Sequence, residues 1–219
     1  MVFTARVDVE QALADPNLVP VPVETGPEGS MAWLRATVAR FAYGEVHVRR
    51  REFVEAELAR IDVAGLRPVG RVGVVRALAG AMGLPELDEA AVGALLVVAA
   101  NYFGGEDPAA DDAVRLLLPL MGSDAEQAAN RIGILVQACD ATAALIEGVR
   151  EFGDVHAALR FAPPVRVMRR VALVATRVGD VEIPAGEVVE LEVGALGLAF
   201  GYGPRVCPGR AVAMALAGA

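Results

Sequence analysis

The chain has 219 residues and a formal net charge of −8, with a sequence pI near 4.9. This length suffices for one domain with its own core, and the acidic balance argues against a nucleic-acid partner or an anionic membrane surface. No apolar run reaches the roughly 20 residues that a bilayer requires, and no secretory leader pattern begins the chain. Two cysteines do not form a disulfide framework. We therefore expect a single soluble, cytoplasmic domain over residues 1–219.

The composition is unusually apolar for an acidic chain, with 55% hydrophobic residues and a mean hydropathy of +0.45. Such a chain either packs densely or leaves apolar surface for a ligand, a partner or a second copy. We therefore expect a hydrophobic ligand pocket, and the composition favours a homodimer.

Apolar periodicity and capping signals predict a chain that is mainly helical with a small β-sheet, an α+β class. Helices are expected over Val7–Leu13, Met31–Phe41, Glu45–Ile61, Val63–Leu84, Leu87–Phe103, Ala113–Met121, Asp124–Phe152 and Arg210–Ala217. The stretch Val19–Ser30 is rich in proline and glycine and predicts a loop, with Ser30 as an N-cap. Residues 165–193 alternate apolar and polar side chains and predict three strands, with turns at 179–180 and 184–186.

The stretch Phe200–Arg210 reads F-G-Y-G-P-R-V-C-P-G-R and is a glycine-rich loop around one cysteine. Gly201, Gly203 and Gly209 lack Cβ atoms, which lets the backbone adopt positive φ and approach a flat ligand closely. Cys207 directly precedes a predicted helix, whose positive end lowers a thiol pKa and favours the thiolate that binds metal. The alternative is a buried structural cysteine in a turn.

Residues 200–209 of this loop fit the heme-binding pattern F-x-x-G-x-[HR]-x-C-x-G, and the loop therefore resembles that of the cytochrome P-450 family. The resemblance rests on Phe200, Gly201, Gly203, Arg205, Cys207 and Gly209. The resemblance implies a reduced cytochrome P-450-like fold and heme b as the cofactor. It makes Cys207 the axial iron ligand and Arg205 a partner of a heme propionate.

Further cations match the family's propionate-binding positions. His47 and Arg51 stand four residues apart and therefore share one helix face. Their H-x-x-x-R spacing, after the lead-in A-R-F-A-Y-G-E-V, is similar to a propionate-binding pair of the family. The alternative is a solvated basic face, because residues 49–51 are consecutive arginines. The similarity continues through P-P-V-R-V-M-R-R, which makes Arg170 another propionate candidate.

The predicted helix over 124–152 resembles the family's oxygen-side helix, whose pattern is A-G-x-[DE]-T-T. Asp140 keeps the acid and is a catalytic candidate, but Ala141 replaces the first threonine. Thr142, the other catalytic candidate, lies one residue further, about 100° around the helix, and would need a local bulge to replace it. Its alternative role is a bond to a carbonyl of the preceding turn.

The family's E-x-x-R motif is incomplete, because Ala157 replaces the glutamate while Arg160 keeps the arginine. Arg160 must then be solvated or paired elsewhere. The resemblance covers most of the chain, which is about half as long as an ordinary member. It lacks the N-terminal sheet region, much of the substrate roof, the segment before the cysteine loop and the C-terminal hairpin, and we interpret it as a truncated relative.

The resemblance implies a heme-thiolate oxidative enzyme, a monooxygenase or peroxygenase, acting on a small hydrophobic molecule in secondary metabolism. Ferredoxin and a reductase, or peroxide, are the expected co-reactants, and Arg49 and Arg50 would offer an acidic ferredoxin a small basic patch. Ala141 keeps open a non-oxygenase heme enzyme, such as a dehydratase, isomerase or bond-forming catalyst. Ala157 and the truncations keep open a heme-free helper protein.

Overall fold

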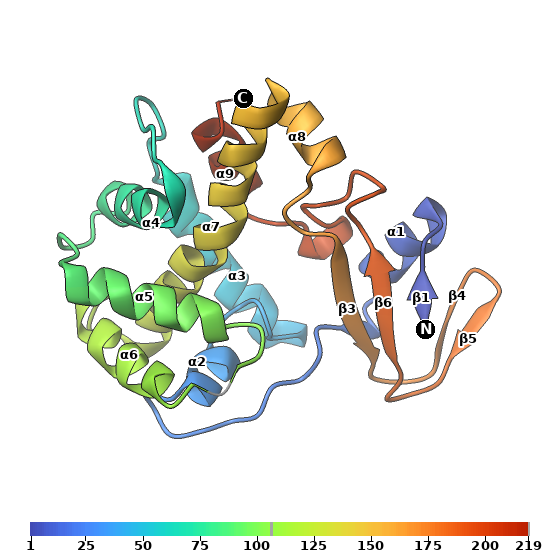
Figure 1. Ribbon diagram of the computed structural model, residues 1–219. Coiled ribbons are helices and arrows are strands. Elements are labelled where there is room, and N and C mark those ends of the chain that lie inside the picture. The colour runs from blue at the N-terminus through green and yellow to red at the C-terminus, as the bar shows by residue number, and fades with distance from the viewer. Residues whose placement is uncertain (106, 219) are drawn as a thin grey trace.

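The computed structural model describes residues 1–105 and 107–218, so the last residue of the predicted 1–219 domain lies outside the described residues. The chain is mainly helical with a small sheet, as the sequence predicts (Figure 1). The helices are α1 (Arg6–Ala14), α2 (Met31–Thr37), α3 (Gly44–Ala59), α4 (Gly70–Ala81), α5 (Glu89–Asn101), α6 (Ala109–Leu117), α7 (Ala125–Phe152), α8 (Val155–Phe161) and α9 (Arg210–Leu216). Two 3₁₀ turns are η1 (Leu118–Leu120) and η2 (Gly203–Arg205).

Three predicted helices differ from the structure because of proline, glycine or an early cap. The helix expected from residue 63 begins at Gly70, since Gly65 adopts a φ of +77° and Pro68 follows it. The helix expected over 113–121 spans Ala109–Leu117 and tightens into η1, which contains Pro119. Helix α2 is capped by Ser30, as predicted, but ends at Thr37 rather than at residue 41.

Helix α7 is the central element and agrees with its predicted bounds. The Asp124 side chain accepts a hydrogen bond from the backbone N–H of Gln127, and Gly153 ends the helix with a φ of +89°. Contrary to the sequence-based expectation, α7 is long and apolar enough to cross a membrane. Of its most apolar 18-residue window, however, 61% is buried inside the protein. This burial is that of a core helix.

The sheet has four strands in the order β1 (Val2–Phe3), β6 (Val188–Glu192), β3 (Val167–Ala172) and β2 (Leu18–Val19). Strand β1 runs parallel to β6, and the other pairs are antiparallel. A separate hairpin joins β4 (Thr176–Val178) to β5 (Val181–Ile183) through the predicted turn at 179–180. The prediction of three strands in 165–193 is therefore wrong, because this stretch forms four. Strands β1 and β2 were also missed, because two residues are too few to show a period.

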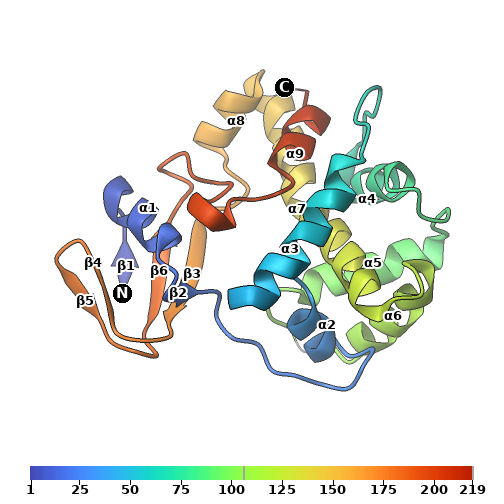
Figure 2. The same cartoon turned by 180° about the vertical axis from the view of Figure 1, so that it is seen from behind.

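Two separate hydrophobic cores form the interior. The larger core joins α2, α4, α5, α6, α7, α8 and α9, and the smaller one joins α1 to the sheet and the β4–β5 hairpin. Both views show α2, α4, α5 and α6 on one side of the molecule and the sheet, together with α1, on the other (Figures 1 and 2). Figure 2 shows the loop that contains η2 passing between α3 and the sheet. The cysteine loop therefore connects the two halves.

Candidate functional site

The cysteine loop is held by its own backbone. The Cys207 N–H donates to the Phe200 carbonyl at 2.8 Å, and the Gly201 N–H donates to the Leu198 carbonyl at 2.7 Å. Gly201 and Gly203 have φ values of +77° and +66°, as their sequence pattern predicts. A Cβ on Gly203 would meet the Cα of Ala14 in α1 at 3.4 Å. Glycine here thus lets the loop turn and also lets it approach α1.

Gly209 has a different role from the other two loop glycines. Its φ is −85°, so positive φ is not the reason for glycine at this position, contrary to the prediction. A Cβ on Gly209 would lie 3.9 Å from the Cys207 sulfur and 4.0 Å from Cδ1 of Leu58 in α3. The missing side chain therefore leaves space beside the thiol.

Cys207 as a residue is exposed to solvent, yet its sulfur is largely surrounded by other parts of the protein. Burial of the sulfur raises its pKa, whereas the hydrogen bond from the Gly209 N–H and the charges of Arg51 and Arg40 lower it. The net direction is upward, so the prediction of a thiol pKa lowered by the helix start is wrong for the protein alone. The cost of removing the thiolate from water outweighs the stabilisation that the nearby hydrogen-bond donor and positive charges give it.

The predicted propionate ligands Arg51 and Arg205 come together at the loop. Arg51 in α3 donates from Nη2 to the Val206 carbonyl at 2.8 Å and from Nε to the Glu55 carboxylate at 2.7 Å. Arg205 in η2 donates from Nη2 to the Ala42 carbonyl at 2.8 Å. Backbone carbonyls thus orient both guanidinium groups while leaving donors available.

Arg170 in β3 is the most deeply buried of these cations, with 3% of its surface exposed. Its Nη1 donates to the Arg169 carbonyl at 2.8 Å, and its Nε has no hydrogen-bond partner among the described residues. Burial lowers its pKa to about 9, and the charges of Arg40 and Arg205 contribute to this lowering. A buried cation without an acid is costly, so this arrangement fits an anion that residues 1–105 and 107–218 do not supply.

His47 lies one turn before Arg51 in α3, and both line a pocket of about 450 Å³ together with Arg205. Burial lowers the pKa of His47 to about 4, with smaller contributions from the charges of Arg205 and Arg51. His47 is therefore neutral at pH 7. Cys207 is not among the residues that line this pocket, which also includes parts of α1 and β2. A second pocket, of about 430 Å³, lies at β1 and β6 and contains none of the predicted site residues.

Arg40 belongs to the same cluster, although it is not among the residues predicted from the sequence. Burial lowers its pKa, whereas Tyr102 and Cys207 raise it. Its guanidinium carbon lies 5.7 Å from the Phe41 ring centre and 5.6 Å from that of Phe103. It stands in the lead-in A-R-F-A-Y-G-E-V-H that carried the resemblance. Nothing in that pattern distinguishes it from the other basic residues of the chain.

The two oxygen-side candidates lie on different faces of α7. Asp140 is exposed and forms an ion pair with Arg71 of α4, whereas Thr142 is buried at 3% exposure. The helix is continuous from Ala125 to Phe152, without the bulge that Thr142 would need to reach the position of Ala141. Both assignments therefore stay predictions, and Asp140 already has a cationic partner.

Arg160, the remaining half of the E-x-x-R motif, is exposed at the end of α8. Its guanidinium carbon lies 5.4 Å from the centre of the Phe161 ring. The side chain is thus solvated and stacked, as predicted for an arginine that has lost its carboxylate.

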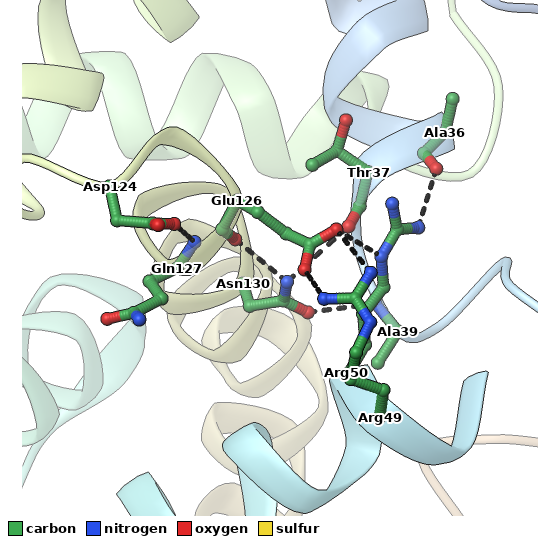
Figure 3. A network of polar contacts seen from close by, with 9 residues as sticks. All are labelled: Ala36, Thr37, Ala39, Arg49, Arg50, Asp124, Glu126, Gln127 and Asn130. Atoms are coloured by element: carbon green, nitrogen blue, oxygen red, sulfur yellow. Dashed lines mark hydrogen bonds and ion pairs between the residues drawn. The ribbon is translucent and has the colours of Figure 1, made fainter. Parts of the chain in front are cut away.

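The expected basic patch at Arg49 and Arg50 is not free. Both guanidinium groups bind the Glu126 carboxylate at the start of α7, and Arg50 also donates to the Ala36 carbonyl at 2.8 Å (Figure 3). The hydrogen bond from Arg49 is the main cause of the lowered pKa of Glu126. These charges bind α3 to α7, and Arg49 stays largely exposed, so a ferredoxin-binding patch there stays a prediction.

No protein-family model matches this chain, and no curated protein matches it. Several solved structures match this chain. One is that of the P-450 BioI in complex with an acyl carrier protein ligated to hexadec-9Z-enoic acid, with 15% identity over 99% of this chain and 82% of that chain, and a TM-score of 0.75. CYP154C4 from Streptomyces sp. W2061 matches with 20% identity over 99% of this chain and 79% of that chain, and a TM-score of 0.68. CYP105P1 matches with 20% identity, the same coverage and a TM-score of 0.66.

The chain has a cytochrome P-450 fold. At 15–20% identity these similarities concern the fold and not the activity. The fold nevertheless brings the cysteine loop together with α3 and β3, three of the segments that carried the sequence resemblance. Four predicted cofactor-binding residues, His47, Arg51, Arg170 and Arg205, interact within it.

Proposed function

We propose that this chain binds heme b, with Cys207 as the axial ligand, and uses it to oxidise a small hydrophobic molecule of secondary metabolism. The observation that supports this proposal is the group of cations beside Cys207. Arg40, Arg170 and Arg205 influence one another's charge, and none of them forms an ion pair with an acid among residues 1–105 and 107–218. Two heme propionates would supply the carboxylates that this group lacks.

The residues present fit heme in three respects. The buried Nε of Arg170 has no partner in the described part of the chain and needs an acceptor. The missing Cβ of Gly209 keeps the space directly beside the sulfur free of a side chain. The thiol is a soft donor of the kind that binds heme iron, and Arg51, Arg40 and the Gly209 N–H each favour its anionic form. Binding of the heme iron to the sulfur would then favour the thiolate and offset the effect of burial, which raises the thiol pKa.

When bound, heme with a thiolate ligand supplies the redox chemistry of oxygen insertion. The chain's own contribution is to bind the propionates through His47, Arg51, Arg170 and Arg205, and to pack the macrocycle beside Phe200. Phe200 is part-buried, and the Arg210 guanidinium lies 5.6 Å from the centre of its ring.

The proposal is tested with apoprotein reconstituted with hemin and reduced under carbon monoxide. We expect the red-shifted Soret band of thiolate ligation, and we expect Cys207→Ala to lose it. Cys139→Ala is the matched control, because Cys139 is a buried residue of α7. A histidine-type spectrum that survives Cys207→Ala would overturn the assignment. Protein that folds but stays colourless with ample heme would favour the heme-free helper.

The state of α7 favours a second candidate, a heme enzyme that is not an oxygenase. Ala141 offers no hydroxyl, and the Asp140 carboxylate pairs with Arg71 rather than standing free to relay protons. A dehydratase, isomerase or bond-forming catalyst needs no such relay. Turnover that requires ferredoxin and a reductase, or peroxide, supports the oxidative proposal. Product formed without reductant or peroxide supports this second candidate.

A further inference from the structure

Arg40 lies in the turn between α2 and α3, over a cluster of three aromatic rings. Phe41, Tyr102 and Phe103 contact one another with ring centres 5.1–6.2 Å apart. The Arg40 guanidinium lies within 6 Å of two of these ring centres, a distance at which a cation interacts with a π face. The aromatic cluster therefore limits the positions that this long side chain can adopt.

The charge of Arg40 acts on the candidate heme site. It is a cause of the lowered pKa of both Arg170 and Arg205, and the Arg40 carbonyl accepts a 3.4 Å hydrogen bond from Arg205. Two buried side-chain atoms, Oη of Tyr102 and Nε of Arg170, have no partner within the described residues. Both residues interact with Arg40 electrostatically. Arg40 thus lies between the aromatic cluster and the predicted propionate ligands.

Among the described residues, the ion pairs do not include Arg40, although many other arginines of the chain have a carboxylate. A guanidinium that is desolvated, placed over aromatic rings and without an acidic partner in the described part of the chain is suited to a carboxylate ligand, which it can bind with two parallel N–H donors. The hydrogen bonds among the described residues include none from the Arg40 side chain, so its N–H groups are available for that purpose.

We propose that Arg40 is a further carboxylate-binding residue of this site and binds a heme propionate alongside Arg170 and Arg205. This inference rests on the proposed function. The inference about Arg40 concerns the porphyrin carboxylates and not the iron, whereas the proposed function also requires iron ligation by Cys207.

The test uses fluorescence titration of the apoprotein with metal-free protoporphyrin, which has both propionates but no iron. We expect Arg40→Met to weaken binding about tenfold or more, since a hydrogen bond between charged groups is lost. Arg150→Met, which changes an exposed arginine of α7, is the matched control and should bind as the parent does. The dimethyl ester of protoporphyrin has no carboxylates and should bind the parent and Arg40→Met equally.

Thermal unfolding of the apoprotein gives a readout independent of binding. We expect Arg40→Met to raise the midpoint relative to the parent, because a desolvated cation beside two others is removed. Should Arg40→Met fold poorly, Arg40→Lys keeps the charge without the planar fork, and we expect it to bind protoporphyrin more weakly than the parent.

Equal protoporphyrin affinity in the parent, Arg40→Met and Arg40→Lys would overturn the inference, as would a parent that binds no protoporphyrin. A different result would overturn the proposed function alone: protoporphyrin binding depends on Arg40, but hemin gives no thiolate spectrum in the parent.

Discussion

At the scale of single residues, the site is defined by cations in a setting of low polarity. The pKa values of Arg170 and Arg205 are lowered to about 9 and about 10, chiefly by burial, so both stay charged at neutral pH. Lowering the pKa of a cation by one corresponds to about 1.4 kcal/mol, and the charged cluster therefore destabilises the protein until an anion binds. His47 avoids this cost by staying neutral.

His47 should make the apoprotein less stable in mild acid. The unfolded chain takes up a proton near pH 6.5, whereas folded His47 does so near pH 4, so the free energy of unfolding falls as the pH drops between these values. Because the imidazole is half-buried and partly screened, we expect a loss of about 1–2 kcal/mol. Urea unfolding of the parent and of His47→Gln at pH 7 and pH 5 measures this loss in the free energy of unfolding.

The loss should be smaller in His47→Gln. His156→Gln is the matched control, because His156 is exposed at the start of α8 and is the other of the two histidines. A parent and a His47→Gln variant with the same pH dependence would contradict the lowered pKa.

At the scale of elements, a carboxylate at the start of α7 sets the position of α3, the helix that carries His47 and Arg51. Glu126 binds Arg49 and Arg50, and Asn130 one turn later accepts from the Ala39 N–H at 2.9 Å (Figure 3). Asn130 also donates to the Thr37 carbonyl at 3.4 Å. The turn after α2, the start of α3 and the start of α7 are thereby joined at one place.

Glu126→Gln should therefore destabilise the protein and weaken heme binding indirectly. The Arg50 side chain is 12% exposed, and removing its carboxylate leaves a partly buried cation, which costs about 1–3 kcal/mol. The measurement is urea unfolding at pH 7, followed by hemin titration. Glu89→Gln is the control, since the Glu89 side chain is 91% exposed in its pair with Arg76 and should show no measurable change. Equal stability of the two variants would contradict this role of Glu126.

At the scale of the whole molecule, the candidate site lies between two hydrophobic cores that share no buried residue. Arg170 comes from a strand on the sheet side, and His47 and Arg51 come from a helix that packs with α7. A ligand held by both sides would connect them. A ligand at 100 times its Kd stabilises the folded state by about 2.7 kcal/mol.

Hydrogen exchange should register this connection. We expect hemin to slow amide exchange in α3, in β3 and in residues 200–210 together. Helix α6, which lies in the helical core away from these segments, should slow less than they do and serves as the internal control. Slower exchange confined to one of the three segments would contradict a ligand bound between the two cores. Cytoplasmic location and self-association stay predictions at this scale.

The amino-acid sequence alone determined the family resemblance, the main helices and four of the five basic residues at the site. Those features are local, because a loop pattern, a cap such as Asp124 or an i, i+4 pair is written in neighbouring residues. The tertiary structure decided the rest. It brought Arg40 to the cluster, gave Arg49 and Arg50 a carboxylate at residue 126, raised the pKa of Cys207 and paired β1 with β6. Each of these depends on burial or on residues far apart in the chain, and desolvation and long-range contacts leave no period in a sequence.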